Sequence, residues 1–183
     1  MALGNINDFR ANLRYGGARS SKFQVTVTNP INGGADNVLP FLCRAASLPA
    51  WSVTPIEVFH FGRPIKFAGN RTFEDWSVTI INDEDFRIRN AMEEWSNAIN
   101  SLEGNVRNTA SSDASEYKSA AEVSQVSQTG EILRTYKFIG IFPTSITAID
   151  MDWSSENVEE FQVNFSYDYY YVSDAITGDA GGT

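Results

Sequence analysis

The 183-residue chain is poor in the residues that most catalytic and metal sites use, since it has one cysteine, Cys43, and one histidine, His60. A single cysteine cannot form an internal disulfide. Cys43 lies in the apolar run FLCRAASLPA, which favours a small core residue over a nucleophile. No nucleophile-elbow spacing accompanies His60, and a zinc site would need more than one histidine and one cysteine. The sequence therefore predicts neither a metal site nor a catalytic histidine.

Other signatures are also missing. No apolar run reaches the length of a membrane span, and the start MALGNINDFRANLRYGG lacks the apolar core of a signal peptide, so we expect no membrane anchor and no export by that route. The glycine pairs lack the Lys-Ser/Thr of a phosphate loop, and NDEDFRIRN lacks the glycine and glutamate of a calcium loop. Two adjacent carboxylate pairs, 74–75 and 159–160, would point to opposite faces of a strand. We expect no enzyme activity and no cofactor.

Positive charge is scarce and unevenly placed. The chain has 14 Lys and Arg against 23 Asp and Glu, a net charge of −9, which disfavours tight binding of naked nucleic acid. Four of the cations, Arg10, Arg14, Arg19 and Lys22, lie in the first 22 residues, with only Asp8 against them. Two interpretations fit: a solubilising charge pattern, or a basic arm that reaches the acidic surface of a neighbouring copy.

Alternating apolar residues predict mainly antiparallel β structure. Strand-like stretches begin at Phe23, Trp51, Arg71, Ile132, Ile146 and Phe161, and Trp76, Val78 and Ile80 share one face. We expect 38–48 to be the second arm of a hairpin with the strand at Phe23, and Pro143 to interrupt a strand. Seven or eight strands with one helix predict a β-sandwich or partial barrel.

One helix and one polar segment stand out between the strands. Residues 83–85 are acidic and suit a helix start, and the spacing of five apolar residues predicts a core-facing helix over about 84–103: Ile88, Met92, Trp95, Ile99 and Leu102. Residues 105–130 hold few large apolar side chains, which predicts a long polar loop. The predicted organisation is an N-terminal arm (1–22), a β-domain (23–172) and a flexible tail (173–183).

The last strand, FQVNFSYDYYYVSD, raises a specific question. Its odd-numbered positions from Phe161 to Tyr171 are apolar or aromatic, which predicts a half-buried strand, but Tyr170 and Val172 break the alternation. A strand with two apolar faces needs a cover on both. The cover is either the rest of this chain or another copy.

Several of these segments resemble the tail tube proteins of T4-like contractile-tailed bacteriophages. The similarity runs from about residue 23 to 171 and is carried by FLCRAASLPA, GRPIKFAGNRTFEDWSVTIINDEDF, EYKSAA, FPTSITAIDMDWSSEN and FQVNFSYDYY. The chain departs from that pattern in a longer start, a longer end and extra residues around 29–36.

The resemblance implies a structural protein. It implies homo-hexameric rings that stack into a hollow tube, with strands of six subunits joined in a continuous inner β-barrel. It also implies partners: a contractile sheath protein, baseplate and tail terminator proteins, and double-stranded DNA that passes through the lumen without specific binding. The expected location is the virion tail, after assembly in the host cytoplasm.

Within that framework the charged and aromatic residues acquire candidate roles. The candidate lumen-facing residues are Glu57, Arg63, Lys66, Glu74 and Asp75, and an acidic lumen would repel DNA phosphates; the same charges could instead lie at subunit contacts or on the outer wall. The candidate subunit-contact residues are Arg10, Arg14, Arg19, Tyr169, Tyr170, Tyr171 and Val172.

Two other functions fit the sequence. A tube-like baseplate initiator or tail terminator would share the fold, although the single-domain length favours the repeating subunit. A carbohydrate-binding β-sandwich would use Trp51, Trp76 and Trp153 as a platform, but Trp76 and Trp153 fall on apolar-facing positions, which favours the core.

Overall fold

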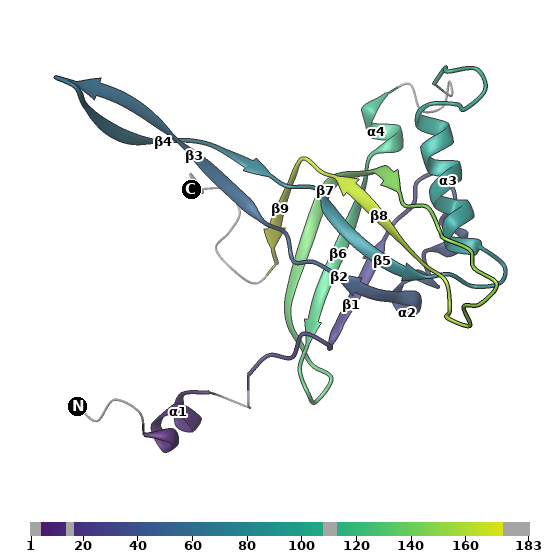
Figure 1. The fold of residues 1–183 in the computed structure, drawn as a ribbon, viewed down its shortest axis with the longest axis horizontal. Coiled ribbons are helices and arrows are strands. Elements are labelled where there is room, and N and C mark those ends of the chain that lie inside the picture. Colours follow the sequence, from purple (N-terminus) through teal and green to yellow (C-terminus); the bar gives the residue numbers. More distant parts are fainter. Residues whose placement is uncertain (1–4, 14–16, 108–112, 174–183) are drawn as a thin grey trace.

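One long strand joins two antiparallel layers in this computed structural model, which describes residues 5–13, 17–107 and 113–173 (Figure 1). The strand order is β1-β6-β7-β8-β5-β2, with β9 paired to β7. The strands are β1 (Phe23–Val27), β2 (Cys43–Ala46), β5 (Trp76–Ile81), β6 (Ser119–Val126), β7 (Ile132–Ile146), β8 (Glu160–Ser166) and β9 (Tyr169–Val172). Every pairing is antiparallel, which confirms the predicted mainly β fold.

A kink at Gly140 lets β7 serve both layers. The first part of β7 pairs with β6 and β9, and its last residues pair with β8. Gly140 has φ of +71°, which L side chains rarely adopt, and the side chain of Asp168, from the bend between β8 and β9, occupies the space beside it. Inward-facing positions consequently change from even to odd along β7: Phe138 before the kink and Ile141 after it are both fully buried.

A bend at Asp168, between β8 and β9, explains the broken alternation of the last strand. Tyr167 is buried directly after β8, Asp168 lies beside Gly140, and the buried position in β9 is Val172, with Tyr170 partly buried. The inward-facing positions thus change from odd to even along one chain. The second apolar face predicted for this strand is therefore one inward face that changes phase at this bend.

The core lies between the two layers and under the helix α3 (Arg87–Ile99). The rings of Trp76 and Phe138 stack with centroids 4.5 Å apart, and the Trp76 indole N–H donates to the Ser47 carbonyl at 2.8 Å. As predicted, Trp76, Val78 and Ile80 share the buried face of β5. From α3, Ile88, Met92 and Trp95 close the core, as their spacing predicted.

The helix is shorter than the predicted 84–103. It begins after Phe86, which has φ of 52°, and the Asp83 carboxylate accepts a hydrogen bond from the Arg87 backbone N–H at 3.0 Å. It ends at Ile99, so Leu102, predicted to be in the core, is 93% exposed. The acidic residues 83–85 therefore lie in a turn before the helix and not in its first turn.

Three other local predictions were wrong. The predicted polar loop, 105–130, contains α4 (Ala114–Tyr117) and the whole of β6, because small apolar residues, Ala121 and Val123, fill the inward positions of that strand. The segment 38–48 is not a hairpin arm: it forms α2 (Leu39–Leu42) and β2, and β1 pairs with β6. The predicted interruption at Pro143 and the predicted strand starting at Ile146 are also absent among the described residues. A register shift next to Pro143 lets β7 continue to Ile146, and the chain from 147 to 159 is a loop.

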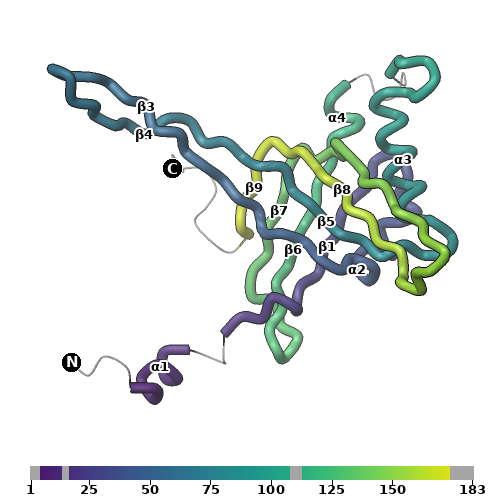
Figure 2. Tube along the Cα trace, in the orientation of Figure 1, coloured from purple at the N-terminus to yellow at the C-terminus, as the bar shows by residue number. Residues whose placement is uncertain are grey.

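Two segments extend from this body (Figures 1 and 2). The strands β3 (Trp51–His60) and β4 (Arg63–Phe73) form a separate two-stranded sheet that projects at one side. The short helix α1 (Ile6–Asn12) lies on an N-terminal arm and buries none of its residues. A short 3-10 turn, η2 (Gly33–Ala35), packs near α3.

Candidate assembly surface

The projecting hairpin is formed by strong local signals. Phe61 and Gly62 connect β3 to β4, and both have positive φ, 47° and 81°, as in the two-residue turns that match the twist of paired strands. The register runs from His60 opposite Arg63 to Trp51 opposite Phe73. One irregularity interrupts the register between Val53 and Pro55. The strands are so close there that any side chain in place of Gly69 would clash with the Thr54 carbonyl oxygen.

Both faces of the hairpin carry apolar side chains that the described part of the chain leaves uncovered. All ten residues of β3 are exposed, and Phe61 at the tip is 97% exposed. Alternation places two cross-strand pairs on one face, Ile56 with Phe67 and Val58 with Ile65. The opposite face carries Pro55, Phe59 and Pro64. A two-stranded hairpin is marginally stable alone, and exposed apolar patches of this kind mark interaction sites.

The base of the hairpin is fixed to the core by aromatic rings. Phe73, at the end of β4, lies 5.7 Å from the Tyr167 ring and 5.6 Å from the Tyr170 ring, measured between centroids. At the same end, the Arg71 guanidinium lies 4.5 Å from the centroid of the Trp51 ring. The hairpin is therefore anchored at one end and uncovered over most of its length.

The five charges predicted to face a lumen lie in three places: the two faces of the hairpin and the turn after it. Lys66 and Glu57 lie across the hairpin from each other with Nζ and Oε1 3.4 Å apart, whereas Arg63 pairs with His60 and so lies on the opposite face. Glu74 and Asp75 are exposed in the turn between β4 and β5. Which of these surfaces lines a lumen stays a prediction.

The acidic turn affects the phenol beneath it. Burial, then the neighbouring Tyr170, Asp75 and Glu74, raise the pKa of Tyr167 to about 12. The Tyr167 hydroxyl is buried without a hydrogen-bond partner in the described part of the chain.

The aromatic residues of β9 are covered by their own chain to different degrees. Val172 is 3% exposed, and the Tyr170 ring contacts Phe73, Tyr136, Phe138 and Tyr167. Tyr169 is half-exposed and Tyr171 partly exposed. For Val172 and Tyr170, then, the cover is intramolecular. Tyr169 and Tyr171 remain candidates for contact with a neighbour.

In the larger sheet, three strands have an edge that pairs with no other described strand: β1, β2 and β9. Each is short, four or five residues, which limits uncontrolled pairing with other chains. On the N-terminal arm, Arg10 and Arg19 are exposed, and Arg14 lies outside the described residues. Edges of this kind allow strand pairing between subunits.

Other candidate sites carry no recognisable chemistry. Burial raises the pKa of the Cys43 thiol to about 11, which fits a structural residue. His60 lies at the exposed hairpin tip, with its ring 4.5 Å from the Phe61 ring. Among the described residues, no three His, Cys, Asp or Glu side chains converge as metal ligands, and no helix is long and apolar enough to cross a membrane.

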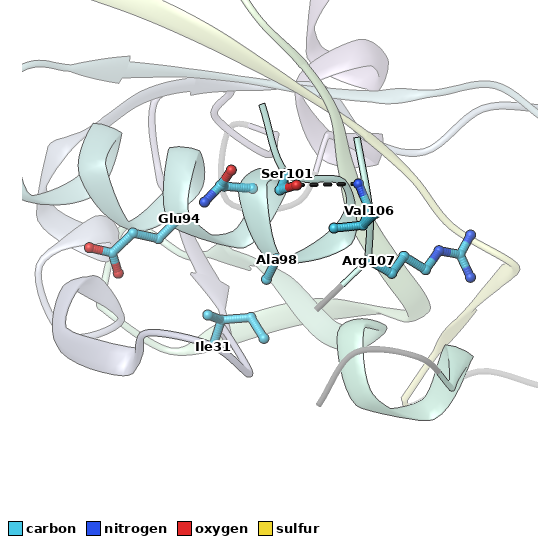
Figure 3. A pocket seen from close by; sticks show the side chains of 7 residues that line it. Ile31, Glu94, Ala98, Ser101, Val106 and Arg107 are labelled. Atoms are coloured by element: carbon cyan, nitrogen blue, oxygen red, sulfur yellow. Dashed lines mark hydrogen bonds between the residues drawn. The ribbon is translucent and has the colours of Figure 1, made fainter. Parts of the chain in front are cut away.

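An open pocket of about 420 Å3 lies beside the end of α3 (Figure 3). Its lining is mixed and holds no pair of catalytic groups: Ile31, Glu94, Asn97, Ala98, Ser101, Val106 and Arg107. The Ser101 hydroxyl accepts a hydrogen bond from the Val106 backbone N–H at 3.2 Å, which closes the turn after the helix.

The tryptophans do not form the platform of a carbohydrate module. Trp76 is buried, as predicted, and Trp51 contacts Arg71. Trp153, predicted to be in the core, is fully exposed in the loop between β7 and β8. The prediction for Trp153 was wrong because β7 ends at Ile146, so the alternation that placed this tryptophan inward does not apply.

Sequence reasoning also missed the apolar residues of the hairpin as a functional surface. The signal was present, because the segment 51–68 has apolar residues at both odd and even positions, as in VFHF. Such a strand is either buried on both faces within its chain or covered by a partner. Only the structure shows that the described part of its own chain does not cover it.

Comparisons with known proteins converge on one family. The sequence profile of a family described as phage tail tube protein matches residues 9–173. The tail tube protein gp19 of Enterobacteria phage T4 is 32% identical over 155 residues, which cover 84% of this chain and 90% of that protein.

Solved structures agree on the fold. The chain superposes on one from the cryo-EM structure of the anti-feeding prophage tube terminating cap with a TM-score of 0.64 at 22% identity, covering 86% of this chain and 91% of that one. A chain of the sheath–tube complex of an extracellular contractile injection system (PVC), in its extended state, gives 0.56 at 19% identity, with 90% and 95% covered. At these identities the likeness establishes the fold.

Proposed function

The chain belongs to the phage tail tube protein family, and we propose that it is the repeating subunit of the tube: six copies form a ring, and rings stack into a hollow tail tube. The observation that carries this proposal is the β3–β4 hairpin, which is apolar on both faces and uncovered by the described part of its own chain. A two-stranded hairpin is marginally stable alone in water, and exposed apolar surface of this kind marks an interaction site.

Hexameric rings with a continuous inner β-barrel give the unpaired edges a role. Pairing between strands of neighbouring subunits satisfies exposed backbone groups and removes edges that otherwise aggregate. The short edge strands β1, β2 and β9 support this arrangement. The half-exposed Tyr169 and the partly exposed Tyr171 on β9 are the aromatic residues that we assign to subunit contacts.

The negative charge suits passage of DNA. Each copy contributes a net −9, and Glu57, Glu74 and Asp75 are exposed on the hairpin and in the turn beside it. If these carboxylates line the lumen, they repel DNA phosphates and prevent adhesion during transit, while Lys66 is paired with Glu57. The function requires no catalytic group and no cofactor, so we propose a purely structural role.

The partners follow from the same proposal. The outer wall of the tube contacts a contractile sheath protein, and its two ends contact baseplate and tail terminator proteins. The protein is a component of the virion tail, assembled in the host cytoplasm. The N-terminal arm (1–22), the β-domain (23–172) and the tail (173–183) are the proposed units of the subunit.

The test compares assembly of the wild-type chain with that of a hairpin variant. Phe59→Ser with Phe61→Ser removes two exposed apolar rings, so the fold and thermal stability should stay unchanged while rings and tubes disappear. Leu102→Ser, at a side chain that is 93% exposed beyond α3, is the matched control and should assemble normally. Negative-stain electron microscopy and sedimentation velocity measure assembly, and near-ultraviolet circular dichroism confirms folding.

Two results would overturn the proposal. One is a wild-type chain that stays monomeric at high concentration, even when seeded with a baseplate fraction. The other is tube formation by the folded hairpin variant at the wild-type level, which would remove the observation on which the proposal rests.

A further inference from the structure

We infer that the N-terminal arm of one subunit docks on the β7–β8 loop (residues 147–159) of another copy in the tube. This inference rests on the proposed function and adds to it the identity of the two contacting segments. Both segments expose large apolar side chains, and their charges are opposite.

The arm is an amphipathic basic segment, and its helix α1 buries no residue against the described part of the chain. Ile6 and Phe9 on α1, and Leu13 directly after it, recur at three- and four-residue spacing and are 70%, 64% and 42% exposed. Residues 1–22 carry four cations and one carboxylate. Across the described residues, neither Arg10 nor Arg19 takes part in an ion pair.

The loop has the complementary chemistry. Residues 147–159 hold four carboxylates and no Lys or Arg, and they expose three apolar side chains: Met151, Trp153 and Val158. Asp152 accepts hydrogen bonds from the Ser154 backbone N–H and hydroxyl at 2.9 and 2.8 Å, and these bonds hold the turn that presents Trp153. Of the other loop carboxylates, Asp150 and Glu156 enter no ion pair within the described ranges.

The placement of the two segments makes the contact intermolecular. Figure 1 shows α1 below and to the left of the domain, whereas the loop between β7 and β8 lies at its lower right edge, beside α2 and α3. The arm therefore points away from the loop of its own subunit. In an assembly that joins different surfaces head to tail, a segment exposed on one side must meet a different segment on the opposite side of the next copy. An arm with three apolar and several cationic side chains fits a loop with three apolar and several anionic ones.

A charge-reversal experiment tests the pairing. Arg10→Glu with Arg19→Glu reverses the arm, and Asp150→Lys with Glu156→Lys reverses the loop while leaving the Asp152 turn intact. Because like charges then face each other, either reversal alone should raise the concentration needed for tube formation about tenfold or more, and the combined variant should recover most of the loss. Glu103→Lys with Glu116→Lys, which makes the same charge change on exposed residues beyond α3, should have little effect.

Photo-crosslinking identifies the contact directly. A benzophenone amino acid in place of Phe9, in tubes assembled from a mixture of 14N- and 15N-labelled chains, should crosslink to peptides from residues 147–159 of a differently labelled chain. Crosslinks to the same chain, or to a sheath protein in whole tails, would overturn the inference.

The failures of the two proposals are distinguishable. If the wild-type chain forms tubes but reversal has no effect, or the combined variant shows no recovery, the arm–loop contact is refuted and the proposed function stands. If the wild-type chain forms no ring or tube, the proposed function fails and this inference falls with it.

Discussion

Replacing Gly140 with alanine should destabilise the subunit, because this glycine is where the two layers join. Its φ of +71° lies in the left-handed region, and a Cβ there would lie 2.1 Å from the Asp168 Oδ2. The Asp168 carboxylate is held in place by Lys118, with Nζ–O distances of 2.7 and 2.9 Å. The new methyl group must push this carboxylate away and so break the ion pair.

The magnitude has two parts. A left-handed backbone costs a residue with a side chain about 1–2 kcal/mol. Loss of the Lys118–Asp168 pair adds about 0.5 kcal/mol, a small figure because the Asp168 side chain is 49% exposed and the pair is screened by water. The total is about 2 kcal/mol, which for a domain of this size corresponds to a decrease of about 4–8 °C in Tm.

Urea denaturation of the unassembled chain, followed by tryptophan fluorescence, measures the loss. Gly130→Ala is the matched control, since Gly130 also has positive φ, +90°, but no atom lies within 4 Å of the position of its Cβ. It should show the backbone cost alone. The Asp168→Ala background removes the clash. In that background, Gly140→Ala should lower the free energy of unfolding by no more than Gly130→Ala lowers that of the wild type.

The reasoning is wrong if Gly140→Ala is no more destabilising than Gly130→Ala. It is also wrong if the double variant loses as much as the two single variants together, because the loss would then not arise from contact between these two side chains.

Three other changes test the core and the anchor of the hairpin. Tyr167→Phe removes a buried hydroxyl that has no hydrogen-bond partner among the described residues, so stability should stay equal or rise by up to about 1 kcal/mol in urea denaturation. Folding raises the pKa of Tyr167 from 10.0 to about 12, so this shift contributes to the free energy of unfolding in full below pH 10, and the contribution is lost as the pH rises to 12. The stability of Tyr167→Phe should therefore fall less than that of the wild type between pH 10 and 12. Asn29→Ala leaves three backbone groups without their side-chain partner, including the Ala91 carbonyl at 2.9 Å, and should cost about 2 kcal/mol in the same assay. Phe73→Ala should cost about 2 kcal/mol because the ring is partly buried, and should increase hydrogen exchange in β3 and β4 more than in β5.

The regular parts of the fold were predictable because their periods are long and consistent. Trp76, Val78 and Ile80 alternate without interruption, and the buried residues of α3 recur every three or four positions, so both faces follow from the sequence. The β6 strand was missed because its inward residues are small, and small residues give a weak apolar signal in a segment rich in serine.

The assembly surface was harder to predict because exposure is a property of the whole fold. The apolar residues of the hairpin look like those of a buried strand, and only tertiary structure shows that residues 5–13, 17–107 and 113–173 leave them exposed. For Tyr170 and Val172 the difference is the reverse: the sequence made them candidates for contact with a neighbour, but their own chain covers them. A bend at Asp168 divides the predicted strand into β8 and β9 and turns these two residues inward, and alternation alone does not reveal it.

The subunit thus combines a local attraction with a distributed repulsion. The hairpin concentrates exposed apolar side chains on a segment that is marginal alone, and such a segment favours association with any chain that can cover it. The net charge of −9 opposes association at a distance, while Pro55 and Pro64 remove backbone donors from the hairpin edges and so restrict pairing to particular registers. Salt screens the repulsion but leaves the burial of apolar surface intact. The balance between free and assembled subunits therefore depends on whether a partner offers a cover in the right register, because only that contact gains enough apolar burial to overcome the shared negative charge.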